Sequence, residues 1–397
     1  MAYFAGVIAF AFGIAVTIAL HEWGHYTVAR LSGMWVRRYF IGFGPTLYSF
    51  RRGHIEYGLK AIPMGGFCDI AGMTAIDQMT AQEQPHAMYK KAWWQRVLVL
   101  CGGIMMNIII GMSIIYGLSL TSGLPNPDAD YRPVIGSLTC VSNTAGGQCT
   151  GTGPGEQAGL QVGDRVISIN GQAVETFSEI APIIQPLAGE TAQFLVDRAG
   201  GQVEVPVPVA TVATPLADGS VSNIGAVGIV SQPITDAVKT YSVITGIPAT
   251  IRFTGDVFAA TWDGLKAFPG KIPGVIAAIF GAQRDEESPM SVVGASRVGG
   301  ELAERNLWAM FWLLLANLNF FLALFNLLPL PPLDGGHIAV VIYEVLRNGL
   351  RRLRGLKPGG PADYRKLMPL TYAATAILVV VGGVVLIADV VNPIRLF

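Results

Sequence analysis

Residues 14–25 read Ile-Ala-Val-Thr-Ile-Ala-Leu-His-Glu-Trp-Gly-His, so an apolar run leads directly into two histidines. On a helix, positions i and i+4 lie on one face, and His21 and His25 can therefore bind one metal ion. Glu22 between them is suited to act as general base in a hydrolysis. Ionisable residues inside a membrane span cost about 2.5–3.5 kcal/mol each and usually mark function. This stretch predicts a metal-dependent hydrolase that works inside a bilayer.

The composition predicts a membrane protein with a soluble part. Charged residues make up 14% of the 397-residue chain, against about 25% in ordinary soluble domains. The 27 basic and 27 acidic residues cancel, so no overall positive charge favours a nucleic-acid partner. Four apolar runs are long enough to cross a bilayer, which takes about 20 residues. They lie near residues 3–20, 97–120, 307–328 and 370–391.

The first run could be mistaken for a cleaved signal peptide. It lacks the basic start and the small-residue cleavage site of such peptides, so we expect it to stay in the mature protein. Basic residues crowd two segments, 30–96 and 347–366, and by the positive-inside rule both are cytoplasmic. The segment from about 121 to 306 and both chain ends are then outside. We expect a multi-pass protein of the plasma (cytoplasmic) membrane with its active site toward the cytoplasm.

The four cysteines divide between the two sides of the membrane. Cys140 and Cys149 lie in the outer segment, separated by turn-forming residues. We expect a disulfide between them, with two free thiols as the alternative. Cys68 and Cys101 lie on the cytoplasmic or membrane side, where thiols stay reduced.

A β-hairpin is predicted between the first two spans. Two short alternating runs, residues 46–50 and 55–62, surround Arg51-Arg52-Gly53. The apolar, glycine-rich stretch 63–67 follows. Irregular backbone is tolerated at membrane depth only where it is buried in protein or lines a wet cavity. We therefore expect a re-entrant hairpin beside the active site, with a small cytosolic hairpin as the alternative.

The outer segment divides into two parts. Residues 131–212 alternate short β-like runs with turns, and 178–187 predicts a short helix. The stretch 158–171, Ala-Gly-Leu-Gln-Val-Gly-Asp-Arg-Val-Ile-Ser-Ile-Asn-Gly, resembles the hallmark segment of PDZ domains. That resemblance implies a groove for an extended peptide, with a spacer or size filter as an equal alternative. In 234–306 apolar residues recur at helical spacing, and the prolines at 233, 248, 269 and 273 predict a series of short amphipathic helices.

A catalytic zinc ion needs three protein ligands and one open position, so we expect a third ligand from another span. Residues 326–336 read Asn-Leu-Leu-Pro-Leu-Pro-Pro-Leu-Asp-Gly-Gly. The prolines must break a helix here, and the glycines permit a close backbone approach. Counted from the outer starts of their spans, this motif and His21 reach similar depths. Asp334 is our choice for the third ligand, and His337 is the weaker alternative.

Together these motifs resemble the site-2 protease family of intramembrane zinc metalloproteases, particularly the bacterial single-PDZ form with actinobacterial-like features. The resemblance spans nearly the whole chain. It implies that His21, His25 and Asp334 are the ligands of a Zn²⁺ cofactor. It also implies Glu22 as the general base.

The resemblance extends to residues that would bind substrate. Asn326 matches the family's substrate-binding asparagine, and Pro329 and Pro331 would shape the unwound loop. The family commonly carries Gly-Pro-x-x-Asn in its second span, whereas residues 103–107 read Gly-Ile-Met-Met-Asn and lack the proline. Asn107 remains available to hydrogen-bond the substrate or its oxyanion, or else it bonds neighbouring helices.

The family implies regulated intramembrane proteolysis, in which peptide bonds are cleaved within transmembrane segments of single-span membrane proteins. Its usual substrates include anti-sigma factors already trimmed by an upstream site-1-type protease, and remnant signal peptides. The PDZ domain would exclude substrates with bulky outer domains. Two alternatives stay open: a membrane-tethered PDZ scaffold with a structural or inert metal site, and a metal transporter, which the lack of internal repeats disfavours.

The expected fold is a multi-pass α-helical membrane protein with four transmembrane helices, a re-entrant β-hairpin and an inserted extracytoplasmic α+β PDZ domain. The domains are expected at 1–31 (first span with the zinc motif), 32–95 (hairpin region), 96–121 (second span), 122–233 (PDZ domain), 234–306 (amphipathic helices), 307–346 (third span with the Asn-Pro-Leu-Asp-Gly motif), 347–369 (basic cytoplasmic loop) and 370–397 (fourth span and end).

Overall fold

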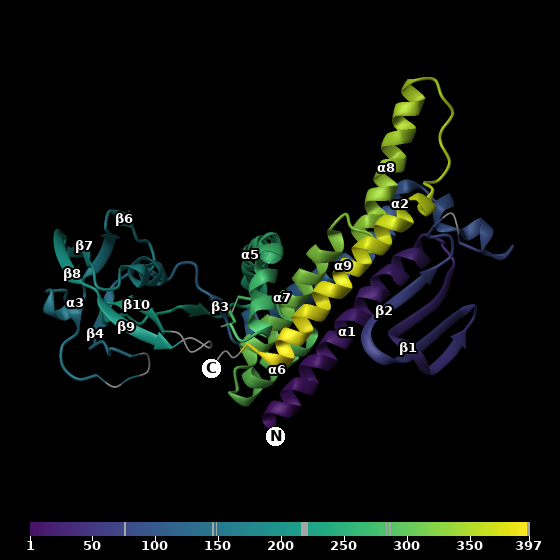
Figure 1. The fold of residues 1–397 in the computed structure, drawn as a ribbon. Helices are drawn as coiled ribbons and strands as arrows, with labels where there is room; N and C mark the ends of the chain where they lie inside the picture. The colour runs from purple at the N-terminus through teal and green to yellow at the C-terminus, as the bar shows by residue number, and fades with distance from the viewer. Residues whose placement is uncertain are drawn as a thin grey trace. The chain divides into compact units, whose positions relative to one another are not determined.

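A computed structural model describes residues 1–74, 77–144, 147, 149–215, 221–282, 284–285 and 287–394. The chain forms two compact units (Figure 1). The first comprises Met1–Gly123, Thr240–Phe280 and Arg284–Phe397, and the second comprises Leu124–Lys239 with Gly281–Gln283. The second unit is therefore an insertion into the sequence of the first.

Within the described ranges, four helices of the first unit are long and apolar enough to cross a membrane, as predicted. They are α1 (Ala2–Leu31), α2 (Trp93–Leu120), α7 (Trp308–Leu327) and α9 (Tyr364–Val391). Helix α1 packs against α2 and against α6 (Val292–Glu304), and α2 packs against α7. Because α2 also contacts α5 (Val243–Ile279) and α8 (Asp334–Leu353), it lies at the centre of the helical unit, and Figure 1 shows α1 running beside the hairpin.

Helix α5 (Val243–Ile279) corrects the expectation of several short helices before the third span. It is one continuous helix of 37 residues with Pro248, Pro269 and Pro273 in its interior. An internal proline removes a backbone donor and costs about 3 kcal/mol or more. Helix α5 packs against α2, α7 and α9, and we infer that this packing offsets the cost. The prolines alone therefore do not end the helix.

The predicted break at the proline motif is present. Helix α7 ends at Leu327, and α8 (Asp334–Leu353) begins after the loop 328–333. A Cβ at Gly335 would lie 2.3 Å from the carbonyl oxygen of Leu328. Only a residue without a side chain lets the first turn of α8 lie against this loop. The glycine contact thereby fixes where Asp334 starts the helix.

Strands β1 (Val36–Arg52) and β2 (Ile55–Ile70) form a long antiparallel hairpin. Its turn follows Arg52, at the predicted place, and both strands extend beyond the predicted runs. Two short 3-10 helices, η1 (Gln84–His86) and η2 (Met88–Lys90), then lead to α2.

The start of β1 lies between two stretches of β2. Tyr39 lies opposite Tyr57 and also opposite Cys68. The last stretch of β2, residues 66–70, therefore has β1 on one side. Among the described residues it pairs with no other strand, so its outer side is an edge.

The second unit is a small α+β domain. Its four-stranded sheet has the order β6-β5-β7-β8, with bounds Gln172–Ala173, Arg165–Ile169, Thr191–Arg198 and Gly201–Pro208. Three two-stranded ladders join β4 (Ile135–Leu138) to β11 (Ile229–Ser231), β9 (Ala210–Pro215) to β10 (Val221–Ala226), and β3 (Leu124–Pro125) to β12 (Val238–Lys239). The helical parts are α3 (Pro154–Gln157), η3 (Phe177–Glu179), α4 (Ile180–Ile184) and η4 (Gln185–Leu187). The last three confirm the predicted helix over 178–187.

A disulfide closes the loop that follows β4. Cys140 and Cys149 are bonded, with their Cα atoms 5.8 Å apart, which confirms the predicted bridge. Cys68 and Cys101 are free, as predicted.

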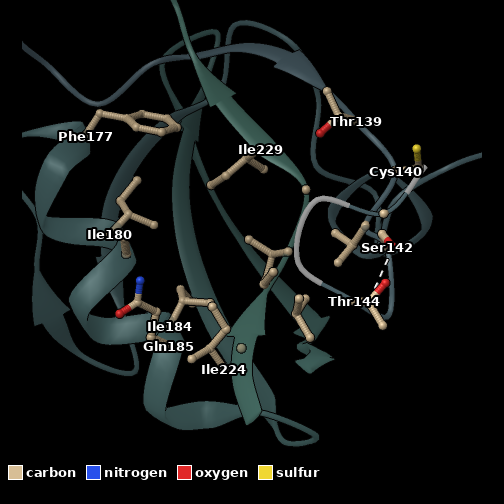
Figure 2. Close-up of a pocket in the computed structure, with 18 of the residues that line it drawn as sticks. Thr139, Cys140, Ser142, Thr144, Phe177, Ile180, Ile184, Gln185, Ile224 and Ile229 are labelled. Carbon is tan, nitrogen blue, oxygen red and sulfur yellow. Dashed lines mark hydrogen bonds between the residues drawn. The ribbon is translucent and has the colours of Figure 1, made fainter. Parts of the chain in front are cut away.

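This disulfide-closed loop forms one wall of a pocket of about 600 Å³ in the second unit. Figure 2 shows Phe177 and Ile180 on one side of the pocket, Ile229 on the strand opposite them, and Thr139 and Cys140 at the loop. The helix and strand walls are mainly apolar, and the loop contributes hydroxyl and backbone groups. Such a pocket can bind apolar side chains while polar groups orient the ligand.

The guanidinium of Arg37 holds the segment after the hairpin against β1. Its Nε donates to Glu83 Oε1 at 2.7 Å and its Nη1 donates to Asp77 Oδ1 at 3.1 Å. The side chains of Arg37 and Glu83 are 21% and 10% exposed. The hydrogen bond from Arg37 lowers the pKa of Glu83 to about 2.

We expect Glu83→Gln to lower the thermal unfolding midpoint by about 2–4 °C at pH 7, because a hydrogen bond between charged groups is lost. The pKa of Glu83 in the folded protein lies below the value of about 4.3 for an unfolded chain. The carboxylate therefore stabilises the fold at neutral pH, and this stabilisation is lost as pH falls from about 5 toward 2. Calorimetry of both proteins from pH 7 to pH 3 measures the difference. A midpoint difference that stays constant with pH contradicts the assignment.

Candidate metal centre

Three ligand-type side chains from distant parts of the chain meet in the first unit. His21 and His25 lie on α1, and Asp334 begins α8. Their donor atoms all lie within 4.8 Å of one another. His25 Nε2 lies 3.2 Å from His21 Nε2 and 3.3 Å from Asp334 Oδ2. His21 Nε2 lies 3.5 Å from Asp334 Oδ2.

These distances fit the donor set of a tetrahedral zinc ion. Zinc binds nitrogen and oxygen ligands at about 2.0–2.1 Å, so two ligands of a tetrahedral ion lie about 3.3–3.4 Å apart. The three observed separations, 3.2, 3.3 and 3.5 Å, bracket that value. Asp334 Oδ2 and His21 Nδ1 are buried, and neither has a hydrogen-bond partner among the residues that the structure describes. A buried carboxylate is costly unless a positive charge lies beside it, so the arrangement fits a cation among the three groups.

Helix α2 orients one of the imidazoles. His25 Nδ1 donates to the carbonyl oxygen of Val99 at 2.8 Å, which leaves the lone pair of Nε2 toward the other two donors. Gly103, one turn further along α2, lies against both rings. A Cβ at this position would lie 2.4 Å from His25 Nε2 and 2.6 Å from His21 Nε2. The backbone of α2 is therefore a wall of the site.

Glycines bring α1 and α2 into backbone contact. A Cβ at Gly24 would lie 2.1 Å from the carbonyl oxygen of Gly102, and a Cβ at Gly102 would lie 2.6 Å from the carbonyl oxygen of Gly24. Small residues allow this close approach between membrane helices. A larger residue at either position would move Val99 and Gly103 away from the imidazoles.

Glu22 faces the end of the hairpin. Gly66 of β2 passes so close that a Cβ there would lie 3.0 Å from Glu22 Cγ. The hydroxyl of Tyr39 on β1 donates to the carbonyl oxygen of Ala19 at 2.6 Å, which fixes the hairpin to α1 one turn before the site. The edge stretch 66–70 thus begins beside Glu22.

Asn107 lies one turn beyond Gly103 on α2 and is 1% exposed. Neither its Nδ2 nor its Oδ1 has a hydrogen-bond partner among the described residues. The alternative in which this amide bonds a neighbouring helix is therefore not observed. A buried amide without partners is costly, so Asn107 is available to a ligand.

The remaining predicted residues lie near the proline motif. Asn326 is half-buried in the last turn of α7, and Pro329 and Pro331 lie in the loop 328–333. His337 is not part of the three-residue cluster. Its Nδ1 lies 3.3 Å from the hydroxyl of Tyr364 instead.

Several groups of the site were not predicted from the sequence. The Val99 carbonyl could not be, because every residue carries one. Gly24 and Gly102 left a weaker signal, whereas the glycine-rich stretch that contains Gly66 was expected beside the active site. A glycine inside a helix costs about 1 kcal/mol relative to alanine, so the two helical glycines called for a packing reason that only the structure supplies.

Known proteins match this chain over most or all of its length. Residues 9–357 match peptidase family M50. The chain is 45% identical over 410 residues to the zinc metalloprotease Rip1 of Mycolicibacterium smegmatis and 43% identical over 409 residues to Rip1 of Mycobacterium tuberculosis H37Rv, with each pair covered over its full length. It is 27% identical over 341 residues to the membrane metalloprotease ARASP of Arabidopsis thaliana, which covers 85% of this chain and 70% of the relative.

We expect Gly103→Ala to lower zinc affinity at least about tenfold, the scale on which groups that orient metal ligands act. The added methyl group would displace one or both imidazoles. Chelator competition on the purified protein measures the affinity.

The matched control is Gly117→Ala on the same helix, where a Cβ would meet nothing within 4 Å. It should bind zinc like the wild type. Equal affinity in the wild type and Gly103→Ala would show that the imidazoles do not depend on this wall.

Proposed function

This chain belongs to peptidase family M50, the site-2 protease family, and we propose that it cleaves peptide bonds within transmembrane segments of single-span membrane proteins. It is a membrane protein and a zinc metalloprotease with Zn²⁺ as its cofactor. The proposal concerns its substrates, its catalytic residues and the use of its two units.

We propose His21, His25 and Asp334 as the zinc ligands. The observation that carries this assignment is the separation of 3.2–3.5 Å among their three donor atoms, which matches the edge of a tetrahedral site. The cluster holds three protein ligands, as in catalytic zinc sites, whereas structural sites usually hold four. The proposal therefore favours a catalytic site over the structural metal of a scaffold.

Zinc, when bound, acts as a Lewis acid and makes water a better nucleophile near neutral pH. Glu22 accepts a proton from the attacking water, whose oxygen forms a bond to the substrate carbonyl carbon. The carbon–nitrogen bond then breaks, and Glu22 returns the proton to the leaving amine. The free amide of Asn107 donates to the developing oxyanion, and Asn326, Pro329 and Pro331 contact the substrate backbone.

A helical substrate must unwind before its carbonyls can react, because they are held in intrahelical hydrogen bonds. We propose that the edge stretch 66–70 binds the unwound segment by strand addition. The closeness of Gly66 to Glu22 supports this, since a strand added at that edge would lie beside the general base. The hairpin would be re-entrant and lie at membrane depth, where contacts with the protein provide hydrogen-bond partners for its backbone.

We propose that the second unit is an extracytoplasmic PDZ domain. The pocket between Phe177, Ile180 and Ile229 supports a peptide-binding role in addition to size exclusion. Substrates would be anti-sigma factors trimmed by an upstream site-1-type protease, or remnant signal peptides. The protein would reside in the plasma membrane with its active site toward the cytoplasm, as the basic loops indicate.

The first test is cleavage of a model single-span substrate co-expressed with wild type, Glu22→Gln or Asp334→Asn, with zinc measured on the purified proteins. We expect Glu22→Gln to retain zinc and lose activity about 10²–10⁴-fold, as for removal of a general base. Asp334→Asn should lose both zinc and activity. Zinc-loaded wild type that leaves a panel of substrates intact would favour the scaffold. Full zinc and activity in Asp334→Asn would overturn the ligand assignment.

The strand-addition step has its own test at Cys68, which lies within the edge stretch. We expect Cys68→Pro to retain zinc and to lose most cleavage, because proline cannot donate to an added strand and also removes the backbone hydrogen bond from Cys68 to Glu22. Cys68→Ala keeps the backbone donor and should cleave normally. Normal cleavage by the proline variant would exclude strand addition at this edge.

A further inference from the structure

A buried ion pair joins α2 to α8. Arg96 Nη1 donates to Glu344 Oε2 at 2.6 Å, although the residues are 248 positions apart in the chain. Their side chains are only 7% and 8% exposed. Glu344 Oε1 also accepts a hydrogen bond from the backbone N–H of Ala362 at 2.6 Å. Neither charged residue belongs to the metal cluster or the mechanism proposed above.

Arg96 lies on the face of α2 that meets the imidazoles. Arg96, Val99 and Gly103 follow one another at intervals of three and four residues, so they form one stripe of the helix. Val99 accepts the hydrogen bond from His25, and Gly103 lies against both imidazoles. Any shift of Arg96 along the helix axis therefore shifts these two contacts by the same amount.

Glu344 lies on the helix that Asp334 begins. The ten residues between them correspond to about 15 Å along α8. Within this interval Ile338 and Val341 are buried in the same apolar cluster as Val99. Apolar contacts of this kind are non-directional and do not by themselves fix how far one helix has slid along another.

We propose that the Arg96–Glu344 pair is a positioning pair that sets the axial register of α2 against α8, and thereby the distance between His25 and Asp334. This inference rests on the ligand assignment proposed above. Sliding by one residue moves a helix about 1.5 Å, whereas metal–ligand distances tolerate about 0.2 Å. A directional bond between fixed charges can hold the helices to this accuracy better than the apolar contacts around it.

Stability alone does not explain the pair. Replacing a buried ion pair by well-packed apolar residues is often neutral or stabilising. A pair kept only for stability would therefore be replaceable without consequence for zinc binding, whereas a register-setting pair would not.

The chain offers a matched control in a second buried pair. Arg284 and Asp389 lie 2.6 Å apart, with side chains 2% and 1% exposed, and they join the segment after α5 to the last turn of α9. Asp389 also accepts a hydrogen bond from the backbone N–H of Ser291 at the start of α6, and none of α5, α6 and α9 carries a proposed zinc ligand. Replacing this pair tests the general effect of removing a buried ion pair from the full-length protein.

The experiment compares wild type, the double variant R96M/E344M, Glu344→Asp, the control R284M/D389M and Asp334→Asn as purified full-length proteins. It measures zinc affinity by chelator competition, the thermal midpoint of the metal-free protein, and kcat and KM. Glu344→Asp retains the charge but shortens the side chain by one methylene group, so that keeping the bond requires the helices to move.

We expect R96M/E344M and Glu344→Asp to bind zinc at least tenfold more weakly than wild type. Their kcat should fall while KM changes little. R284M/D389M should bind zinc within threefold of wild type, whatever its thermal midpoint.

Wild-type zinc affinity in Glu344→Asp, or in a folded R96M/E344M, would overturn the proposal. If R96M/E344M does not fold, Glu344→Asp alone decides the outcome. Asp334→Asn distinguishes a failure of the zinc-ligand assignment from a failure of the positioning role. If it keeps wild-type affinity, the ligand assignment fails, and if it loses zinc while the pair variants do not, only the positioning role fails.

Discussion

The first unit depends on one constraint: two imidazoles and a carboxylate must stay within about 3.5 Å of one another between apolar helices. In such surroundings each unpaired polar group is expensive. The direct backbone contact of Gly24 with Gly102 brings α2 close enough for its Val99 carbonyl to orient His25. The loop 328–333 brings the start of α8 to the same place. The helix bundle can therefore be understood as the arrangement that satisfies this cluster.

Sequence reasoning succeeded where a residue type carries its own chemistry or breaks a helix. The four long apolar helices, the break before Asp334 and the disulfide all have such signals, and the part of the chain that the structure describes contains all of them. Predictions from the sequence failed where packing between distant segments decides the local structure. Helix α5 continues through Pro248, Pro269 and Pro273 because its neighbours stabilise it. The two pairing partners of Tyr39 depend on how β2 folds back beside β1, and no pattern within either strand predicts this.

The two units differ in how far their functional groups can be identified from the sequence. In the first, the decisive groups are few and polar, so short sequence motifs are enough to identify them. In the second, the pocket is built from apolar side chains and a disulfide-closed loop. Such a surface resembles an ordinary domain core in sequence, and only the arrangement of α4, β11 and the loop reveals it. The chemistry of the first unit is therefore easier to infer from sequence than the pocket of the second.

The absence of a side chain at Gly103 also has a consequence for inhibitor design. The α2 backbone lies against both imidazoles there, so a chelating drug cannot approach the ligands across that helix. The neighbouring hairpin presents a different surface, because Gly66 passes Glu22 without a side chain. A compound that couples a zinc-chelating group to a short peptide-like backbone would match that approach. Its selectivity over soluble metalloproteases would then come from the hairpin edge and not from the metal.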